Sequence, residues 1–594
     1  MRIANSESQT LNPQSRITIE AALWVLVALA ALVLRLSHLD AAPLNVYEAR
    51  EAMLAWRAVT GQGMPQSGYS PLLFAANALL FTLCGASDAI ARLWPAFLGS
   101  ALPLTPLLLR RRIGRVGALA AGLYLAFSPT ALVAARQLDG AVLAAVGAML
   151  FLGGLLRFLD TFDTNGRSWL TLSAGGLALA VTSSPSAYGL LLTLGLAWLI
   201  LSQIWPNRKL DSPHWTLGIR HWTLDSHWSL FIGHCSLTVI ALSTGLGWNL
   251  AGVGVVGDLL LDWFARFGPA ANPAASLLTI LIAYEPLALL FGLGGLVWAV
   301  RRGHRFGALM GLWAGLGVLL LILMPGRSPL DTMWIILPLA LLAGIAVESL
   351  ARSLRERGDW LGEGIYIPVT LVLWVHTYLV LARYAARGEP TDLFLALLVI
   401  ALQAVMGVMF ALVMRPAAAL RGAAAGIGLA LLAFTLSAAW GAAYARPSDP
   451  REPLLRAPTA LEVRDLAQTL RTLSWRETGM ATTLPLAFEA APDSVLAWYL
   501  RDFSAARRVE SLTAEDAGLT LVTSQRDLSL AEGEYVGQDF VLRRSWNPDA
   551  ARCAWGWPPQ CSAAAKWLLL RRTPLPPVAD QWAVLWLENR EIGK

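Results

Sequence analysis

The chain has 594 residues, of which 56% are hydrophobic and only 14% are charged, and its mean hydropathy is +0.54. Soluble domains carry about 25% charged residues, so this composition excludes an ordinary soluble protein and predicts an integral membrane protein. The net charge is +6, but the basic residues stand in short clusters between apolar runs. That distribution is typical of a topology signal and argues against nucleic-acid binding. A membrane enzyme or a transporter is the class that remains.

The first predicted element is a membrane span that begins at residue 18 and ends near Leu36. The apolar run is about 20 residues long, which suffices to cross a bilayer and exceeds the core of a signal peptide. No small-residue cleavage site follows it. We therefore expect a retained helix, with residues 1–17 as a cytoplasmic tail.

Residues 38–91, called the first loop below, follow this span and are expected outside the cytoplasm. Glu48 stands there at the start of an amphipathic segment. Arg50 and Glu51 are expected to turn toward water. The apolar face of the segment holds three large side chains, Met53, Leu54 and Trp56.

Residues 71–85 are apolar but too short for an ordinary span, which favours a re-entrant or interfacial helix. If they stay on one side, a span over 92–109 delivers a basic cluster to the cytoplasm; if they cross, the cluster lies outside. The cluster consists of Arg110, Arg111, Arg112 and Arg115. The positive-inside rule favours the first arrangement, which also places Asp139 on the same outer face as Glu48.

The remaining apolar runs complete a helical membrane domain over 18–444. They predict spans near 116–134, 140–159, 169–183, 186–204, 229–247, 276–300, 306–324, 330–351, 364–383, 392–414 and 420–441. With the two earlier spans the bundle has about thirteen helices, which leaves the C-terminal tail outside the cytoplasm.

Residues 445–594 are polar and mixed, and they predict a small extracytoplasmic α/β domain. The segment 461–475 has the period of an amphipathic helix, whereas 518–525 and 534–546 read as strands. Cys553 and Cys561 flank a Pro–Pro turn, so they either form a disulfide in an oxidising compartment or remain unpaired.

A polar linker contains three histidines, His214, His221 and His227. Their spacings do not place them on one helical face. No other cluster with metal-ligand spacing is present, so the sequence does not indicate a metal or another cofactor.

Two carboxylates on the outer face, Glu48 and Asp139, are the candidates for chemistry. A carboxylate beside the membrane can act as a general base toward an acceptor hydroxyl. Arg50, Arg136 and Arg327 are candidate cations for a phosphate leaving group. Each residue also has a plainer reading: Glu48 as a charge of a helix face, Asp139 as a helix cap, and the arginines as contacts to lipid headgroups.

Several segments of the sequence resemble a known family, the integral-membrane GT-C glycosyltransferases of the protein O-mannosyltransferase-like group. This group includes the aminoarabinose transferases of lipid A. The segments that carry the resemblance are 47-YEAREAMLA-55, 84-CGASDAIARLWPAFLGS-100, 110-RRRIGRVGALAAGLYLAFSP-129, 134-AARQLD-139, 284-YEPLALLFGLGG-295 and 324-MPGRSP-329. The resemblance implies a polyprenyl-phosphate-linked sugar donor and transfer outside the cytoplasm to a lipid, glycan or protein acceptor. It also implies that acidic residues of the first two outer loops act in catalysis, and these fall on Glu48 and Asp139.

The chain departs from the family pattern at Tyr47, because the family has an Asp before the Glu of its first loop. The segment 182–189 also lacks the family's Lys. The resemblance then implies that Glu48 is the base or orients the acceptor and that Asp139 supports it. From the residues themselves, we expect Tyr47 and the three arginines to line the substrate site. Two other functions remain open, namely a catalytically silent protein that binds lipid-linked glycans and a transporter or flippase of lipid-linked sugars.

Overall fold

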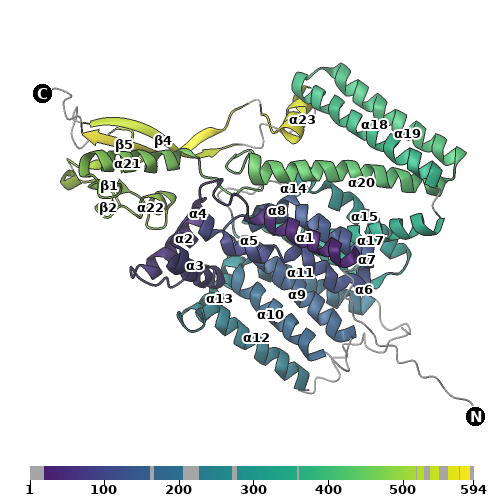
Figure 1. The fold of residues 1–594 in the computed structure, drawn as a ribbon, viewed down its shortest axis with the longest axis horizontal. Helices are drawn as coiled ribbons and strands as arrows, with labels where there is room; N and C mark the ends of the chain where they lie inside the picture. The colour runs from purple at the N-terminus through teal and green to yellow at the C-terminus, as the bar shows by residue number, and fades with distance from the viewer. Residues whose placement is uncertain are drawn as a thin grey trace, which may run out of the picture.

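The computed structural model describes residues 19–160, 166–204, 226–269, 277–357, 360–516, 518–527, 535–546, 559–573 and 575–588. Within these ranges a large helical domain is followed by a small sheet domain that lies at one end of it (Figure 1). The predicted fold class, a polytopic helical bundle with a small C-terminal α/β domain, is confirmed.

Helix α1 (Ile19–Leu36) coincides with the first predicted span. It ends at a buried arginine, Arg35, whose guanidinium donates to the carbonyls of Leu125 and Ala126 at 3.0 and 3.2 Å. A charge at this depth is tolerated because carbonyl oxygens replace its water. The bonds attach the end of the first helix to the last turn of the helix that ends at Phe127.

The first loop contains three helices, α2 (Val46–Val59), α3 (Pro71–Cys84) and α4 (Asp88–Ala91). Helix α3 has 14 residues. At about 1.5 Å per residue it extends for about 21 Å, whereas the hydrocarbon core of a bilayer is about 30 Å thick. Its length therefore agrees with the prediction that this segment does not cross.

The predicted span over 92–109 is an interrupted helix rather than a regular one. It runs through α5 (Leu93–Gly99) into η1 (Leu102–Leu109), which has the tighter 3-10 geometry, and ends in α6 (Arg110–Ile113). Pro103 and Pro106 explain the change, because neither has an N–H to donate to the helix ladder.

Two further predicted spans, 116–134 and 276–300, are corrected to bent pairs. The pairs are α7 (Arg115–Phe127) with α8 (Pro129–Ala135), bent by 56°, and α14 (Leu277–Tyr284) with α15 (Pro286–Arg301), bent by 98°. Each break comes directly before a proline, whose ring disfavours helical backbone at the preceding residue. The Ser–Pro and Glu–Pro dipeptides were a signal for these breaks.

The two breaks meet at Glu285, which is fully buried. Its carboxylate accepts hydrogen bonds from the Ser128 hydroxyl at 2.8 Å, from the Thr130 N–H at 3.0 Å, and from the Tyr124 hydroxyl. The carboxylate thus satisfies an N–H that the break leaves without a helical partner. These bonds fix the direction of α8, which leads into the turn that carries Asp139.

The other helices of this domain match the remaining predicted spans, apart from α13 and the short helices η4 and η5. They are α9 (Ala141–Asp160), α10 (Gly166–Ser183), α11 (Ser186–Ile204), α12 (Ser226–Thr244), α13 (Gly252–Ala265), α16 (Arg305–Ile322), η4 (Pro329–Thr332), α17 (Met333–Arg357), α18 (Trp360–Arg387), α19 (Pro390–Val413), α20 (Pro416–Trp440) and η5 (Gly441–Ala445). By length and apolar character, the described residues contain eight membrane-spanning candidates, or up to ten if each bent pair counts as one span.

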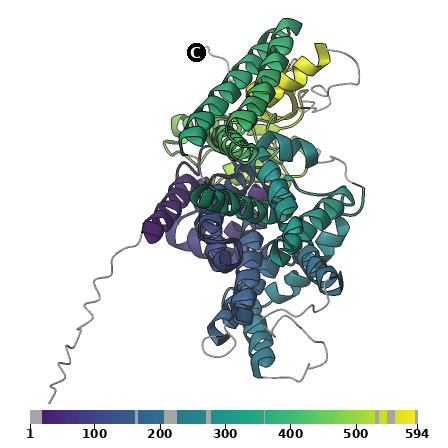
Figure 2. The same cartoon turned by 90° about the vertical axis from the view of Figure 1, so that its right-hand side faces the viewer.

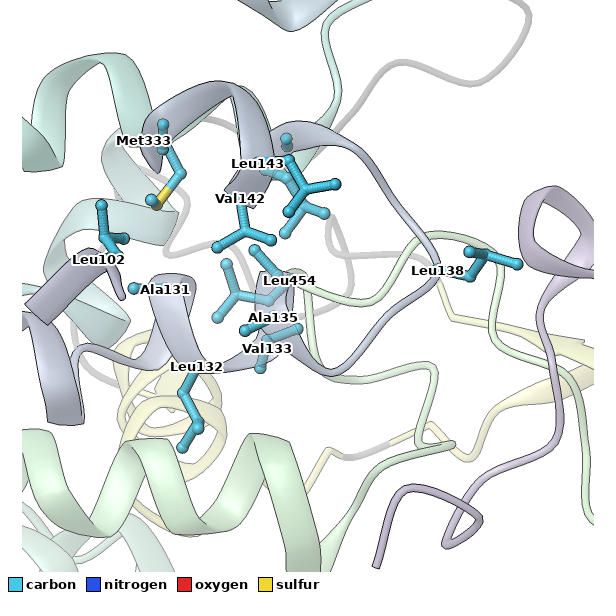
Figure 3. Close-up of a cluster of buried hydrophobic side chains, with 14 of the residues drawn as sticks. Leu102, Ala131, Leu132, Val133, Ala135, Leu138, Val142, Leu143, Met333 and Leu454 are labelled. Carbon is cyan, nitrogen blue, oxygen red and sulfur yellow. The ribbon is translucent and has the colours of Figure 1, made fainter. Parts of the chain in front are cut away.

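Helices α9 and α17 form the centre of the bundle. In α9, 72% of the apolar stretch is buried, and in the stretch formed by η4 and α17, 89% is buried. Helices α18 and α19 are apolar but largely exposed, as expected for surfaces that face lipid, and stand at the opposite end from α12 (Figures 1 and 2). Figure 3 shows the buried cluster around α8, in which Leu454 joins side chains of α8 and α9. The segment after the last span is therefore packed into the bundle.

The C-terminal domain has a five-stranded sheet in the order β2-β1-β3-β5-β4. Its strands are β1 (Leu486–Glu489), β2 (Ala506–Val509), β3 (Thr520–Thr523), β4 (Tyr535–Ser545) and β5 (Val578–Glu588), of which β1 is parallel to β2 and β3. Its helices are α21 (Glu462–Thr478), α22 (Val495–Leu500), η6 (Ala514–Asp516) and α23 (Pro559–Leu570). The predicted helix and both predicted strands are confirmed. The side chains of the three linker histidines and of the two C-terminal cysteines lie outside the described residues.

Candidate functional site

Glu48 lies in the first turn of α2 and is buried, with 2% of its surface exposed. Asn45 caps this helix, and the Glu48 carboxylate accepts the Asn45 N–H at 2.9 Å in return. The same carboxylate accepts the Leu138 N–H at 2.8 Å and two hydrogen bonds from Arg92, each 2.7 Å long. Glu48 therefore joins the first loop to the turn that contains Asp139. Its role as the base stays a prediction.

Arg92 completes this arrangement from the other side. Its guanidinium also donates to the carbonyls of Leu39, Ala42 and Pro43 at 2.7–3.0 Å. Burial lowers the pKa of Arg92, but the Glu48 carboxylate outweighs that effect and holds the pKa above its usual value. The Glu48–Arg92 pair is a buried, fully hydrogen-bonded ion pair that holds the first loop in shape.

Asp139 lies in the turn between α8 and α9. One of its carboxylate oxygens accepts the Ala141 N–H at 2.7 Å, so the residue caps α9. No hydrogen bond to its other oxygen is found among the described residues. Burial raises the pKa of Asp139, while the Ala141 N–H and the charges of Arg266 and Arg456 oppose that rise. Asp139 is thus a carboxylate with one oxygen available to a substrate.

Glu51 differs from its prediction, because it does not turn toward bulk water. Its carboxylate is half-buried, and both of its oxygens lie 3.2 Å from the Ser70 nitrogen. The chain after α2 folds back at this point and covers the helix. Burial raises the pKa of Glu51 to about 8; the Ser70 N–H and Arg50 lower it, and Asp139 and Asp262 add to the rise.

The signal that could have found Glu51 is its spacing from Glu48. Residues three apart on a helix lie on the same side of it, so Glu51 points in roughly the direction of Glu48. The described residues contain no group of three or more acidic, histidine or cysteine side chains that could hold a metal ion.

Two cations act electrostatically on these carboxylates, Arg266 on Asp139 and Arg50, which lies on α2 itself, on Glu51. Arg266 follows α13, pairs with Asp331 at 3.0 Å, and acts electrostatically on Asp139. Arg50 lies against Gly68, where an added Cβ would come within 2.4 Å of its guanidinium. Gly68 has φ +74°, so this close approach depends on a glycine for both space and backbone conformation.

The structure places the other two predicted arginines at helix ends. Arg136 donates to the carbonyls of Leu34, Ser37 and His38 at 2.5–3.1 Å, at the end of α1. Arg327 donates to two carbonyls at the end of α16, at 3.2 and 3.4 Å. Cations are stabilising at helix C-termini. No contact among the described residues brings Arg327 to Asp139, and phosphate binding by either arginine stays a prediction.

Tyr47 is 42% exposed, and its ring lies beneath the guanidinium of Arg456, at 3.6 Å from the ring centroid. Arg456 belongs to residues 446–461, called the joining segment below, which connect the two domains. Sequence reasoning missed Arg456 because this contact bridges about four hundred positions of the chain.

The sheet domain is attached to the first loop through Asp88. Its carboxylate accepts hydrogen bonds from Trp498 at 2.8 Å and from Tyr499 and Arg464 at 2.7 Å each. Burial alone would raise the pKa of Asp88, but these three donors together hold it below its usual value. The Tyr499 hydroxyl also accepts the Leu44 N–H at 3.1 Å. The sheet domain is therefore fixed directly over the segment that leads into α2.

Solved structures with a similar fold give this geometry a context. ArnT from Cupriavidus metallidurans bound to undecaprenyl phosphate is 19% identical with a TM-score of 0.51, covering 85% of this chain and 93% of that chain. The apo form of ArnT from the same organism is 20% identical with the same TM-score and coverage. The Archaeoglobus fulgidus oligosaccharyltransferase complex with Zn and sulfate is 11% identical with a TM-score of 0.42, covering 82% of this chain and 62% of that chain.

No family model matches the chain, and no curated protein sequence matches it. At the identity found for ArnT, the structural similarity shows the fold. The protein is an integral membrane protein whose fold is similar to that of ArnT, and the resemblance predicted from the sequence motifs is confirmed at the level of the fold.

Proposed function

We propose that the protein is a membrane glycosyltransferase that takes a sugar from a polyprenyl-phosphate donor and transfers it to an acceptor hydroxyl. The observation that carries this proposal is the hydrogen bond from the Leu138 N–H to the Glu48 carboxylate, which joins the first loop to the turn of Asp139, where Glu51 and Arg266 act electrostatically, on a fold similar to that of an ArnT whose structure holds undecaprenyl phosphate. We propose further that this face is extracytoplasmic, since the positive-inside rule places the first loop there.

The proposed reaction joins the acceptor oxygen to the anomeric carbon of the sugar. The bond between that carbon and the phosphate oxygen breaks, and polyprenyl phosphate leaves with the electron pair. The proton of the acceptor hydroxyl passes to a carboxylate. The arginines near Asp139 stabilise the negative charge that develops on the phosphate.

Asp139 is our candidate for the base. It has an oxygen that no described residue occupies, and neighbouring Glu51, with its pKa near 8, keeps a proton at neutral pH. Two adjacent carboxyl groups resist ionising together, so a protonated Glu51 favours an ionised Asp139. Glu48 positions Asp139 through the Leu138 N–H. If Glu48 is itself the base, the acceptor must replace one of the donors that now occupy it.

Sugar transfer by the purified full-length protein tests this proposal. The protein is reconstituted in nanodiscs and supplied with a panel of polyprenyl-phosphate sugars and with lipid, glycan and protein acceptors. We expect transfer with at least one donor. Absence of both transfer and donor hydrolysis across the panel would overturn the proposal.

One observation favours a second candidate, a catalytically silent protein that binds the lipid-linked donor. Tyr47 stands where the resembled family has an acidic residue, and its ring is occupied by Arg456. Saturable donor binding without any turnover in the same experiment would favour this candidate.

A further inference from the structure

A small cavity separates the first loop from the joining segment. Three guanidinium groups and one carboxylate line it, those of Arg92, Arg136, Arg456 and Glu48. The carboxylate is paired with Arg92, whereas Arg136, within the part of the chain that the structure describes, donates to neutral carbonyl oxygens and lies over the ring of Tyr444. The cavity therefore has an excess of positive charge, which makes it suited to an anion.

Of the three arginines that line the cavity, Arg456 is the most available to a ligand. Its guanidinium contacts the ring of Tyr47, and no carboxylate pairs with it among the described residues. It also acts electrostatically on Asp139, the proposed base. A guanidinium that stacks on a ring keeps its N–H groups free at its edges, where they can bind phosphate in a bidentate manner.

The backbone around Arg456 is fixed on both sides. Leu454, two residues before it, is fully buried, and the Thr459 hydroxyl donates to the Leu44 carbonyl at 2.8 Å. Ala457 adopts φ +46°, in the left-handed region that a residue with a Cβ rarely occupies. Such strain persists only where the surroundings impose it, and it marks a turn that directs Arg456 into the cavity.

Tyr47 explains why this arginine stays available. An aspartate at this position would lie against the guanidinium and would neutralise it as an ion pair. The tyrosine ring instead holds the cation by its face without cancelling its charge. The contact between Tyr47 and Arg456 thus accounts for both the departure from the family pattern and the unneutralised charge of the arginine.

We propose that Arg456, held on the ring of Tyr47, binds the phosphate of the polyprenyl-phosphate donor, so that the joining segment completes the donor site. This inference rests on the proposed function and adds a residue from outside the helical domain to the site. The bound phosphate would leave the attached sugar beside Asp139. Arg456 acts here as a binding residue that contacts the leaving group.

The dissociation constant of undecaprenyl phosphate, measured on the full-length protein in nanodiscs, tests the inference. We expect Arg456→Gln to weaken binding at least tenfold and Arg456→Lys to weaken it less, since lysine keeps the charge but loses the bidentate geometry. Arg476→Gln is the matched control, because Arg476 is an exposed arginine in the last turn of α21. This control should bind like the unmodified protein.

Tyr47→Asp sharpens the test, because the new carboxylate should capture Arg456. We expect it to weaken binding about as much as Arg456→Gln, and to add little when both changes are combined. Thermal unfolding of each variant confirms that it is folded. Unchanged affinity in folded Arg456→Gln would overturn the inference, and additive losses in the double variant would overturn the role of Tyr47.

Inorganic phosphate distinguishes a lipid headgroup from a free anion. We expect it to compete with undecaprenyl phosphate only at far higher concentration, and to lose this competition in Arg456→Gln. Equal affinity for the two ligands would overturn the assignment to a lipid donor. If the unmodified protein transfers sugar and Arg456→Gln does so with an unchanged KM, the inference fails alone; if the unmodified protein neither binds nor transfers, the proposed function fails with it.

Discussion

Two glutamates on helix α2, Glu48 and Glu51, show how the same side chain takes opposite roles three residues apart. Glu48 is enclosed by four donors, two of them from Arg92. Glu51 meets a single backbone N–H and acidic neighbours, so its pKa rises to about 8. A residue near the reacting groups is therefore identified better by an oxygen that lacks hydrogen-bond donors than by its position in a sequence motif.

The largest expected effect comes from breaking the Glu48–Arg92 pair. Glu48→Ala leaves Arg92 buried without its counter-charge, which should destabilise the fold by about 3–5 kcal/mol. Arg92→Ala should do the same. The check is the unfolding temperature in detergent, with Arg476→Ala as the control. A Glu48→Ala protein with the stability of the unmodified chain would contradict the structural role of this pair.

A smaller effect is expected where the sheet domain meets the first loop. Asp88→Asn removes the charge that receives bonds from Arg464, Trp498 and Tyr499, and each hydrogen bond to a charged group contributes about 1.5–3 kcal/mol. We expect faster proteolysis of the sheet domain while the helical domain remains intact. Because the folded pKa of Asp88 is lowered, its contribution should be present above the unfolded pKa and be lost as the pH falls through the folded value.

Equal proteolysis rates for Asp88→Asn and the unmodified protein would contradict this account of the attachment. Asp580→Asn is a suitable control, because Asp580 pairs with Arg543 within the sheet domain itself. That change should leave the attachment to the first loop unaffected.

A different kind of effect, a pH slope, is expected to depend on Glu51. Its folded pKa of about 8 lies above its ordinary value of 4.5, so the folded state holds a proton that the unfolded state releases. Stability should therefore fall as the pH rises from about 4.5 to about 8, and then level off. Glu51→Gln should flatten this part of the curve. The measurement is the unfolding temperature at closely spaced pH values, and an unchanged slope in Glu51→Gln would contradict the buried, protonated state.

Much of the fold could be predicted because long apolar runs carry their own signal. The first span, the short α3 and the strands β3 and β4 follow from hydropathy and period alone. The bends at Ser128 and Glu285 were readable from the prolines that follow them, although the unbroken apolar runs obscured them.

The candidate site was harder to predict, because its contacts join distant parts of the chain. The motif located Glu48 and Asp139, and the structure joins the Glu48 carboxylate to the N–H of Leu138, the residue before Asp139. However, the partner of Glu48 is 44 residues away, and nothing local distinguishes Arg92 from other arginines. Glu51 is half-buried because the start of α3 folds back over it, and Arg456 comes from the joining segment, about four hundred positions from Tyr47.

We propose that Asp139 takes the proton of the acceptor. The rate of sugar transfer in a single turnover by Asp139→Asn is the most direct test of this role. Asparagine caps a helix as well as aspartate does, so α9 and the unfolding temperature should be preserved. We expect the affinity for the donor to be preserved as well, while the transfer rate falls by about 10²–10⁴-fold, the usual contribution of a general base. A folded Asp139→Asn protein that transfers sugar at the rate of the unmodified chain would contradict the account.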